Sequence, residues 1–224
     1  MLACRFFNLV VIYRSRELKN IFLKKTKMEK QEKKITGNNF GGADEASAGL
    51  KFINPSAIID TLEITTGMLI GDFGAGTGYF TFPLAQKVGD SGVVYALDIL
   101  KEKLEAIESE AKILGLNNIV TKRANLEMTG GSKLEADSLD LVCLVNMLFQ
   151  NKSKNLIFEE AVRVLKKSGK VLVIEWNIGD STFGPTSDLR ISKTEILKLA
   201  KDCGLTIVRE IEISHFHFGI IFEK

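Results

Sequence analysis

The chain has 224 residues, of which 45% are hydrophobic and 26% charged, the composition of an ordinary globular domain with a full core. Its net charge of +2 is unevenly spread, because residues 1–34 hold ten Lys and Arg against three Glu, whereas the rest holds twenty against twenty-five Asp and Glu. The body of the chain is therefore mildly acidic, which argues against a broad basic surface for nucleic acid there.

The basic segment 1–34 predicts an N-terminal extension, followed by a single domain at 35–224. Its longest apolar run, residues 6–13, is far shorter than the roughly 20 residues of a transmembrane helix, so no transmembrane segment is predicted. Arg-Ser-Arg follows that run where a secretory signal would need small residues. Three interpretations stay open: a disordered basic tail, an Arg-rich targeting leader, or a start placed too early, with Met28 as the internal alternative.

A turn-rich segment and a helix open the domain. Residues 37–50 are rich in Gly, Asn and small side chains and predict a loop. Asn54 and Pro55 then predict a helix to about residue 62, because Asn is a good N-cap and proline suits the first helical position.

From residue 68 onward, short apolar strands alternate with amphipathic helices. The strand segments are almost continuously apolar, which is typical of buried parallel strands. Ser192 and Glu195 form a capping-box pattern at the start of the last helix, after a loop at 177–191. We predict strands at 68–73, 92–97, 118–122, 139–145, 170–176, 205–214 and 216–223, and further helices at 79–88, 101–114, 155–165 and 192–203.

The last two predicted strands are separated by almost nothing. They must pair antiparallel, because a parallel crossover needs a dozen residues or more. The sequence therefore predicts an α/β fold of the doubly wound type, mostly parallel, that ends in an antiparallel hairpin.

The segment that carries the chemistry follows the first strand. Glycines at 74, 76 and 78 stand between a strand and a helix, where they let the backbone turn tightly and approach a ligand. The ligand then lies at the carboxyl edge of the sheet, beside a helix N-terminus. Asp72 precedes the first glycine by two residues and suits a cationic amino-acid head group, whereas Asp98, at the end of the next strand, can accept both hydroxyls of a ribose.

The glycine spacing argues against a dinucleotide. A dinucleotide fingerprint is G-x-G-x-x-G, but here the third glycine comes one residue early and Tyr79 occupies the expected place. A carboxylate at Asp72 also fits poorly beside a pyrophosphate. A nicotinamide-dependent oxidoreductase is therefore the weakest of the enzyme hypotheses.

The pattern D-x-G-x-G-x-G, with an acid closing the second strand, resembles the class I S-adenosylmethionine-dependent methyltransferases. The resemblance covers roughly residues 54–224 and is nearest to the small methyltransferases of ubiquinone and menaquinone biosynthesis. It implies a Rossmann-like, doubly wound seven-stranded sheet with an antiparallel last strand, and S-adenosyl-L-methionine as the cofactor.

The resemblance also implies roles for individual residues. Asp72 would hold the methionine ammonium, the three glycines would cradle the methionine portion, and Asp98 would bind the ribose. The remaining positions are Ile99 beside the adenine, Asn125 at the adenine amino group, and Asn146 and Met147 near the methyl group. Asn125 departs from the family pattern, which often has Asp there. A turn residue at Asn125 and a plain strand-end residue at Asn146 are the structural alternatives.

The sequence is less specific about the residues that would bind the methyl acceptor. Asn146 is followed by Met147, Leu148 and Phe149 rather than by Pro-Pro-Tyr, which argues against the subset that methylates amide or exocyclic base nitrogens. Phe183 and Arg190 lie in a loop long enough to form a lid, where they would cover an apolar acceptor and meet an anion, and Trp176 would line the same pocket. Alternatively, Phe183 packs within the loop, Arg190 is a solvated charge and Trp176 belongs to the ordinary core. The sequence identifies no general base, so the catalytic residues are left unassigned.

Histidine and cysteine residues give no metal prediction. His215 and His217 would share a face of a regular strand, but the nearest acids would point to the other face and no Cys lies nearby. Cys4, Cys143 and Cys203 form no CxxC pair, which favours reduced thiols in a cytoplasmic protein.

The leading hypothesis is a methyltransferase acting on a small-molecule acceptor. An RNA or protein methyltransferase that uses the basic extension, and a non-catalytic S-adenosylmethionine-binding module, remain as alternatives. The oligomeric state and the identity of the acceptor stay open.

Overall fold

The computed structural model describes residues 52–179 and 183–224, and these belong to the second of two compact units, Asp44–Lys224. The basic extension and the predicted loop at 37–50 lie outside the described residues. The helices are α3 (Pro55–Thr61), α4 (Thr81–Val88), α5 (Lys101–Leu114), the short 3₁₀ helix η1 (Leu148–Gln150), α6 (Lys154–Val164) and α7 (Lys193–Asp202). The strands are β1 (Leu69–Phe73), β2 (Val93–Asp98), β3 (Ile119–Arg123), β4 (Leu139–Val145), β5 (Leu165–Trp176), β6 (Thr206–Ser214) and β7 (His217–Glu223).

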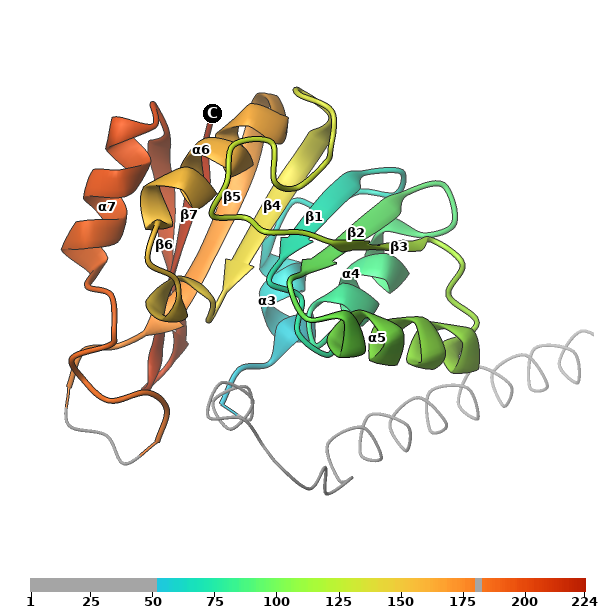
Figure 1. Ribbon diagram of the computed structural model, residues 1–224, viewed down its shortest axis with the longest axis horizontal. Helices are drawn as coiled ribbons and strands as arrows, with labels where there is room; N and C mark the ends of the chain where they lie inside the picture. The colour runs from blue at the N-terminus through green and yellow to red at the C-terminus, as the bar shows by residue number, and fades with distance from the viewer. Residues whose placement is uncertain (1–51, 180–182) are drawn as a thin grey trace, which may run out of the picture. The chain divides into compact units, whose positions relative to one another are not determined.

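The seven strands form one sheet in the order β3-β2-β1-β4-β5-β7-β6 (Figure 1). The pairs from β3 through β5 are parallel, whereas β7 runs antiparallel to both β5 and β6. This confirms the predicted doubly wound, mostly parallel sheet with an antiparallel last strand. The carboxyl ends of β1, β2, β4 and β5 meet at one edge, and the first residue of β7 lies at that same edge, since His217 pairs with Trp176.

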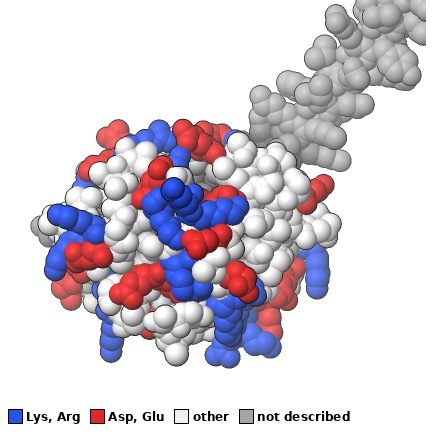
Figure 2. Space-filling view, turned by 90° about the horizontal axis from the view of Figure 1, so that it is seen from above, with Lys and Arg blue, Asp and Glu red and all other residues white. Residues whose placement is uncertain are grey.

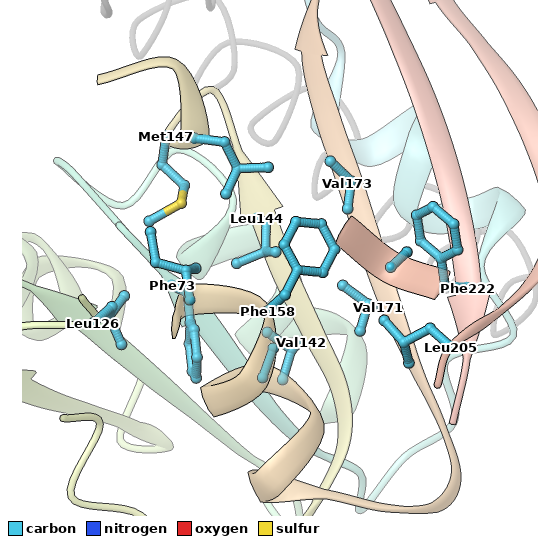
Figure 3. Close-up of a cluster of buried hydrophobic side chains, with 14 of the residues drawn as sticks. Phe73, Leu126, Val142, Leu144, Met147, Phe158, Val171, Val173, Leu205 and Phe222 are labelled. Carbon is cyan, nitrogen blue, oxygen red and sulfur yellow. The ribbon is translucent and has the colours of Figure 1, made fainter. Parts of the chain in front are cut away.

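Helices cover both faces of the sheet. On one face α3 and α4 pack against a cluster that includes Ile70, Leu172 and Ile174, with α5 beside them over β2. The other face carries α6 and α7 over a larger cluster around Phe73 and Phe158, and Figure 3 shows this cluster between the sheet and α6. Burial of these apolar side chains is the main force that holds the layers together.

Two helix starts match their predicted caps. Asn54 Oδ1 accepts a hydrogen bond from the Ala57 N–H at 3.2 Å, and Pro55 is the first residue of α3. Ser192 Oγ accepts from the Glu195 N–H at 3.1 Å at the start of α7.

Some boundaries differ from the prediction. Residue 165 was predicted to end a helix, but Leu165 begins β5, because it pairs with Leu139 of β4. The last two strands, predicted at 205–214 and 216–223, each begin one residue later than predicted. His215 lies in the turn between β6 and β7 and His217 is the first residue of β7, so no regular strand runs through both histidines.

Charged side chains of both signs are interspersed on the face drawn in Figure 2. Of the three cysteines, Cys143 is buried and Cys203 is half-buried, and both are free thiols. Within residues 52–179 and 183–224, no helix has the length and apolar character needed to cross a bilayer.

Candidate functional site

The turn after β1 depends on glycine at three positions. Gly74, Gly76 and Gly78 have φ angles of 75°, 54° and 89°, in the left-handed region that L-residues with a side chain rarely adopt. The N–H groups of Gly74 and Ala75 donate to the Leu97 carbonyl at 2.8 and 2.9 Å, which ties the turn to the end of β2. The turn is therefore fixed at the carboxyl edge of the sheet, as the sequence predicted.

Packing explains two of the three glycines further. A Cβ on Gly74 would lie 3.0 Å from Met147 Cβ, and a Cβ on Gly78 would lie 2.6 Å from the Phe82 ring. At Gly76, by contrast, no heavy atom lies within 4 Å of the position that a Cβ would take. The space over the Gly76 backbone is thus free of described protein atoms and open to a ligand.

Asp98 closes this turn from β2. Its two carboxylate oxygens accept hydrogen bonds from the N–H groups of Gly76 and Leu100, both at 2.9 Å. The carboxylate is half-buried and each oxygen keeps a second lone pair, so it can still accept from a diol. Ile99 beside it is 53% exposed, which leaves an apolar surface next to the carboxylate.

Asp72 lies at the end of β1 and is buried. It accepts a hydrogen bond from Thr81 Oγ1 at 2.6 Å, and no ion pair links it to any residue that the structure describes. Burial raises the pKa of Asp72 to about 6, although the Thr81 hydroxyl acts in the opposite direction. A buried carboxylate without a cationic partner is a favourable site for a ligand cation.

Asn125 is exposed in the turn after β3, where its Oδ1 accepts from the Glu127 N–H at 3.1 Å. This is the local hydrogen bond of an Asx turn, the structural alternative for this residue. The Asn125 carbonyl oxygen keeps one lone pair. Its contact with the adenine amino group stays a prediction.

Asn146 follows β4 in a left-handed conformation with φ of 48° and is 4% exposed. Its N–H donates to the Ile174 carbonyl at 2.8 Å, and its Nδ2 lies 3.1 Å from His217 Nε2. Its Oδ1 is buried and has no hydrogen-bond partner among the described residues. The next residue, Met147, packs against Gly74, so this strand end contacts the glycine turn.

Arg190 is buried and donates to four backbone carbonyls, those of Asn177, Gly179, Phe183 and Pro185. The alternative that it is a solvated charge is therefore wrong. Its guanidinium also lies 5.5 Å from the centre of the Trp176 ring. Arg190 thus organises the loop between β5 and α7, and its predicted contact with an anion stays a prediction without support from these bonds.

Trp176 and Phe183 lie on the same side of the site. Trp176 is fully buried, its ring contacts the His217 ring with centroids 4.1 Å apart, and its Nε1 has no acceptor among the described residues. Phe183 is 48% exposed and meets Phe52 and Phe216 with ring centroids 5.3 and 5.8 Å away. Three segments distant in sequence therefore form one aromatic cluster, Phe52–Phe183–Phe216.

Three further polar side chains at this edge were missed by the sequence analysis: Thr81, Ser214 and Glu175. Glu175 is fully buried beside η1 and accepts from the Leu148 N–H at 2.6 Å. Burial raises its pKa to about 8, against the effect of nearby backbone N–H groups. The signal for it was a single acid inside the apolar run 171–176.

No group of three metal-ligating side chains occurs among the residues that the structure describes. His217 is buried at the start of β7, whereas His215 is exposed in the preceding turn.

Comparison with known proteins gives one family. A family model described as a methyltransferase domain matches residues 64–209. The aklanonic acid methyltransferase DauC of Streptomyces sp. (strain C5) is 36% identical over 96 residues, which is 42% of either chain. The demethylmenaquinone methyltransferase of Lactococcus lactis subsp. lactis (strain IL1403) is 34% identical over 110 residues, 49% of this chain and 42% of that one.

The chain thus spans less than half the length of these curated relatives. Among solved structures, a SAM-dependent methyltransferase from Aquifex aeolicus is similar, with a TM-score of 0.72 and 22% identity over 81% of this chain and 99% of that one. At this identity the likeness shows the fold. The family model, however, matches well over half of the chain, and the chain belongs to the methyltransferase domain family.

Proposed function

We propose that this protein is an S-adenosylmethionine-dependent methyltransferase that acts on a small-molecule acceptor. The observation that carries the proposal is the pair of carboxylates around the glycine turn. Asp72 is buried with no cation beside it among the described residues, and each oxygen of Asp98 keeps a free lone pair. A ligand with a cationic amino-acid end and a ribose satisfies both, and a dinucleotide leaves the buried Asp72 without a partner.

The proposed cofactor contacts follow from this arrangement. Asp72 holds the methionine ammonium, and the open backbone at Gly76, between Gly74 and Gly78, accommodates the methionine portion. Asp98 accepts from the ribose hydroxyls, and the exposed Ile99 contacts the adenine. Asn125 is proposed at the adenine amino group, and Asn146 and Met147 are proposed near the reacting methyl group.

The cofactor supplies a methyl group that is already activated on a sulfonium. The protein's task is then to orient the acceptor behind that methyl and to exclude water, so proximity and electrostatics dominate. The buried strand ends around Asn146 and Trp176 suit this task. A general base is needed only where the acceptor atom is protonated at neutral pH, and the proposal assigns no residue to that role.

The names of several relatives support a small-molecule acceptor, since they refer to aklanonic acid, demethylmenaquinone and arsenite. The charge pattern supports it as well. Lys and Arg are interspersed with Asp and Glu on the face drawn in Figure 2, which does not favour nucleic acid on that face. A cytoplasmic location is part of the proposal, supported by the free thiols of Cys143 and Cys203.

Isothermal titration with S-adenosylmethionine tests the proposal. We expect micromolar binding and, in Asp98→Ala, a dissociation constant about tenfold higher, because a charge-assisted contact to the ribose is lost. NADH serves as the control ligand and should bind more weakly. Absence of S-adenosylmethionine binding at millimolar concentration would sink the proposal, and binding without turnover across a broad acceptor panel would favour a non-catalytic module.

A further inference from the structure

Three side chains form a hydrogen-bonded row across the carboxyl edge of the sheet, from β6 to the end of β4. Ser214 Oγ lies 3.2 Å from His217 Nδ1, and His217 Nε2 lies 3.1 Å from Asn146 Nδ2. His217 and Asn146 are 71 residues apart in sequence and are 1% and 4% exposed. We call this row Ser214–His217–Asn146 the relay.

The hydrogen-bond donors and acceptors of the relay can be assigned from Asn146. With Asn146 Nδ2 as donor, His217 Nε2 must be the unprotonated ring nitrogen, and the proton therefore sits on Nδ1 and faces Ser214 Oγ. Burial, together with the nearby Arg190 charge, lowers the pKa of His217 to about 4, so the ring is neutral at pH 7. A neutral imidazole in this tautomer holds the Asn146 amide with its Oδ1 turned away from the ring.

The amide oxygen Oδ1 of Asn146 is the atom available to a ligand. It is buried and has no donor among the described residues, and an unsatisfied buried carbonyl costs about 1–3 kcal/mol in general. The neighbouring Met147 packs on Gly74 of the glycine turn, so the unsatisfied oxygen belongs to the residue beside the proposed cofactor loop. Trp176, which contacts the same imidazole, adds a buried Nε1–H without an acceptor among those residues.

The charged groups nearby are already committed. The Arg190 guanidinium donates to backbone carbonyls, and Glu175 holds its proton at pH 7 because burial raises its pKa to about 8. Phe216, next to His217 in sequence, joins the aromatic cluster with Phe52 and Phe183. Apart from the Arg190 guanidinium, the described surroundings of the relay are therefore apolar or neutral. Three buried polar atoms there have no partner among the described residues: Asn146 Oδ1, Trp176 Nε1 and Oε2 of the protonated Glu175.

We infer that the relay selects an uncharged, largely apolar methyl acceptor that carries a hydroxyl group. The hydroxyl donates to Asn146 Oδ1 and can accept from Trp176 Nε1, while the rest of the molecule lies against aromatic side chains. Asn146 contacts the acceptor, and His217 and Ser214 are positioning residues that fix the amide. This inference rests on the proposed function and goes further by naming the acceptor's chemistry.

The test uses three alcohols and their methyl ethers, namely phenol and anisole, 1-naphthol and 1-methoxynaphthalene, and 1-octanol and methyl octyl ether. Each compound is titrated calorimetrically into the full chain saturated with S-adenosylhomocysteine. We expect at least one alcohol to bind about tenfold more tightly than its ether, because only the alcohol can donate to Asn146 Oδ1. Equal binding within every pair, or binding of none of the six compounds while S-adenosylhomocysteine still binds, would overturn the inference.

Variants separate positioning from a merely structural role. His217→Phe keeps a ring beside Trp176 but removes both hydrogen bonds, and Ser214→Ala removes one, so both should reduce the preference for the alcohol to about twofold or less. Ser214→Thr keeps the hydroxyl and should restore the preference. His215→Gln is the matched control, because His215 is exposed and outside the relay. A His217→Phe variant that binds S-adenosylhomocysteine normally and keeps the full preference contradicts the inference.

A spectroscopic measurement tests the orientation without any acceptor. The chain has only two histidines, so ¹⁵N-histidine labelling with His215→Gln assigns both rings. We expect His217 as the neutral Nδ1–H tautomer at pH 7. A charged ring, or the Nε2–H tautomer, would mean that Asn146 presents Nδ2 instead and would overturn the inference. If the wild-type chain does not bind S-adenosylhomocysteine at all, that result counts against the proposed function instead.

Discussion

Asp72 and Glu175 are the two buried carboxyl groups at the carboxyl edge of the sheet whose pKa is raised, to about 6 and about 8. In both, burial is the largest cause. The difference between them is chemical context, since Asp72 lies beside the glycine turn and Glu175 lies beneath the start of η1. One is therefore poised to receive a cation, and the other stays protonated at neutral pH.

The pKa of Asp72 predicts that cofactor binding depends on pH. In the proposed cofactor site only the ionised carboxylate of Asp72 attracts the methionine ammonium, and below pH 6 the carboxyl is mostly protonated. The S-adenosylmethionine dissociation constant should therefore be about tenfold higher at pH 5 than at pH 7, measured by calorimetry. Asp72→Asn should bind weakly at both pH values, and equal wild-type affinity at the two would contradict the assignment.

Glu175 predicts a pH dependence of stability without ligand. Its folded pKa is raised above the ordinary value of 4.5, so its contribution to stability is present below that value and is lost as pH rises through about 8. Glu175→Gln cannot ionise and keeps an oxygen for the Leu148 N–H. Between pH 7 and pH 9 the melting temperature of the wild type should fall more than that of Glu175→Gln, and parallel decreases would be evidence against a buried, protonated Glu175.

At the scale of elements, α6 holds the segment between β3 and β4. Glu160 of α6 accepts hydrogen bonds from the N–H groups of Gly130 and Ser132, at 2.9 and 3.0 Å, and from the Ser132 hydroxyl and Arg163. Burial alone would raise the pKa of Glu160, but these hydrogen bonds outweigh it and lower the pKa to about 2. One carboxylate thereby anchors a long connection to a helix.

Replacing that carboxylate should weaken the fold measurably. Glu160→Gln loses charge-assisted acceptors and should lower the free energy of unfolding by about 2 kcal/mol at pH 7, as measured by urea denaturation. The difference from wild type should shrink as pH falls from 4.5 toward 2, because the carboxylate becomes protonated there. Glu159→Gln is the control on the same helix, since Glu159 is exposed, and an equal loss in both variants would contradict the anchoring role.

Local sequence patterns predicted most helices and strands correctly. They failed where a boundary depends on pairing between residues that are far apart in sequence. The helix at 101–114 and the strand at 139–145 were correct to the residue, because periodicity and apolar runs are local signals. Leu165 starts a strand because of its partner Leu139, which no window around it could reveal. The same limit applied to the site: the glycine turn was visible in one segment, whereas the contact between Asn146 and His217 joins residues that are far apart in sequence.

At the scale of the whole molecule, the described domain lies within a compact unit, Asp44–Lys224. We therefore expect a chain lacking residues 1–34 to fold and to bind S-adenosylmethionine within about twofold of the full chain. Circular dichroism and calorimetry on both chains measure this. A deletion variant that is unfolded, or that loses cofactor binding, would show that the extension belongs to the domain.

The position of β7 in the sheet has a consequence for synthesis on the ribosome. Strands β1 to β5 and the glycine turn emerge first and can pair in the order in which they are made, whereas β6 emerges before β7 yet pairs with no other described strand. β6 can therefore join the sheet only after β7 has been translated and has paired between β5 and β6. In this order of synthesis the proposed cofactor site can form first, and His217, which is translated with β7, completes the proposed acceptor site last.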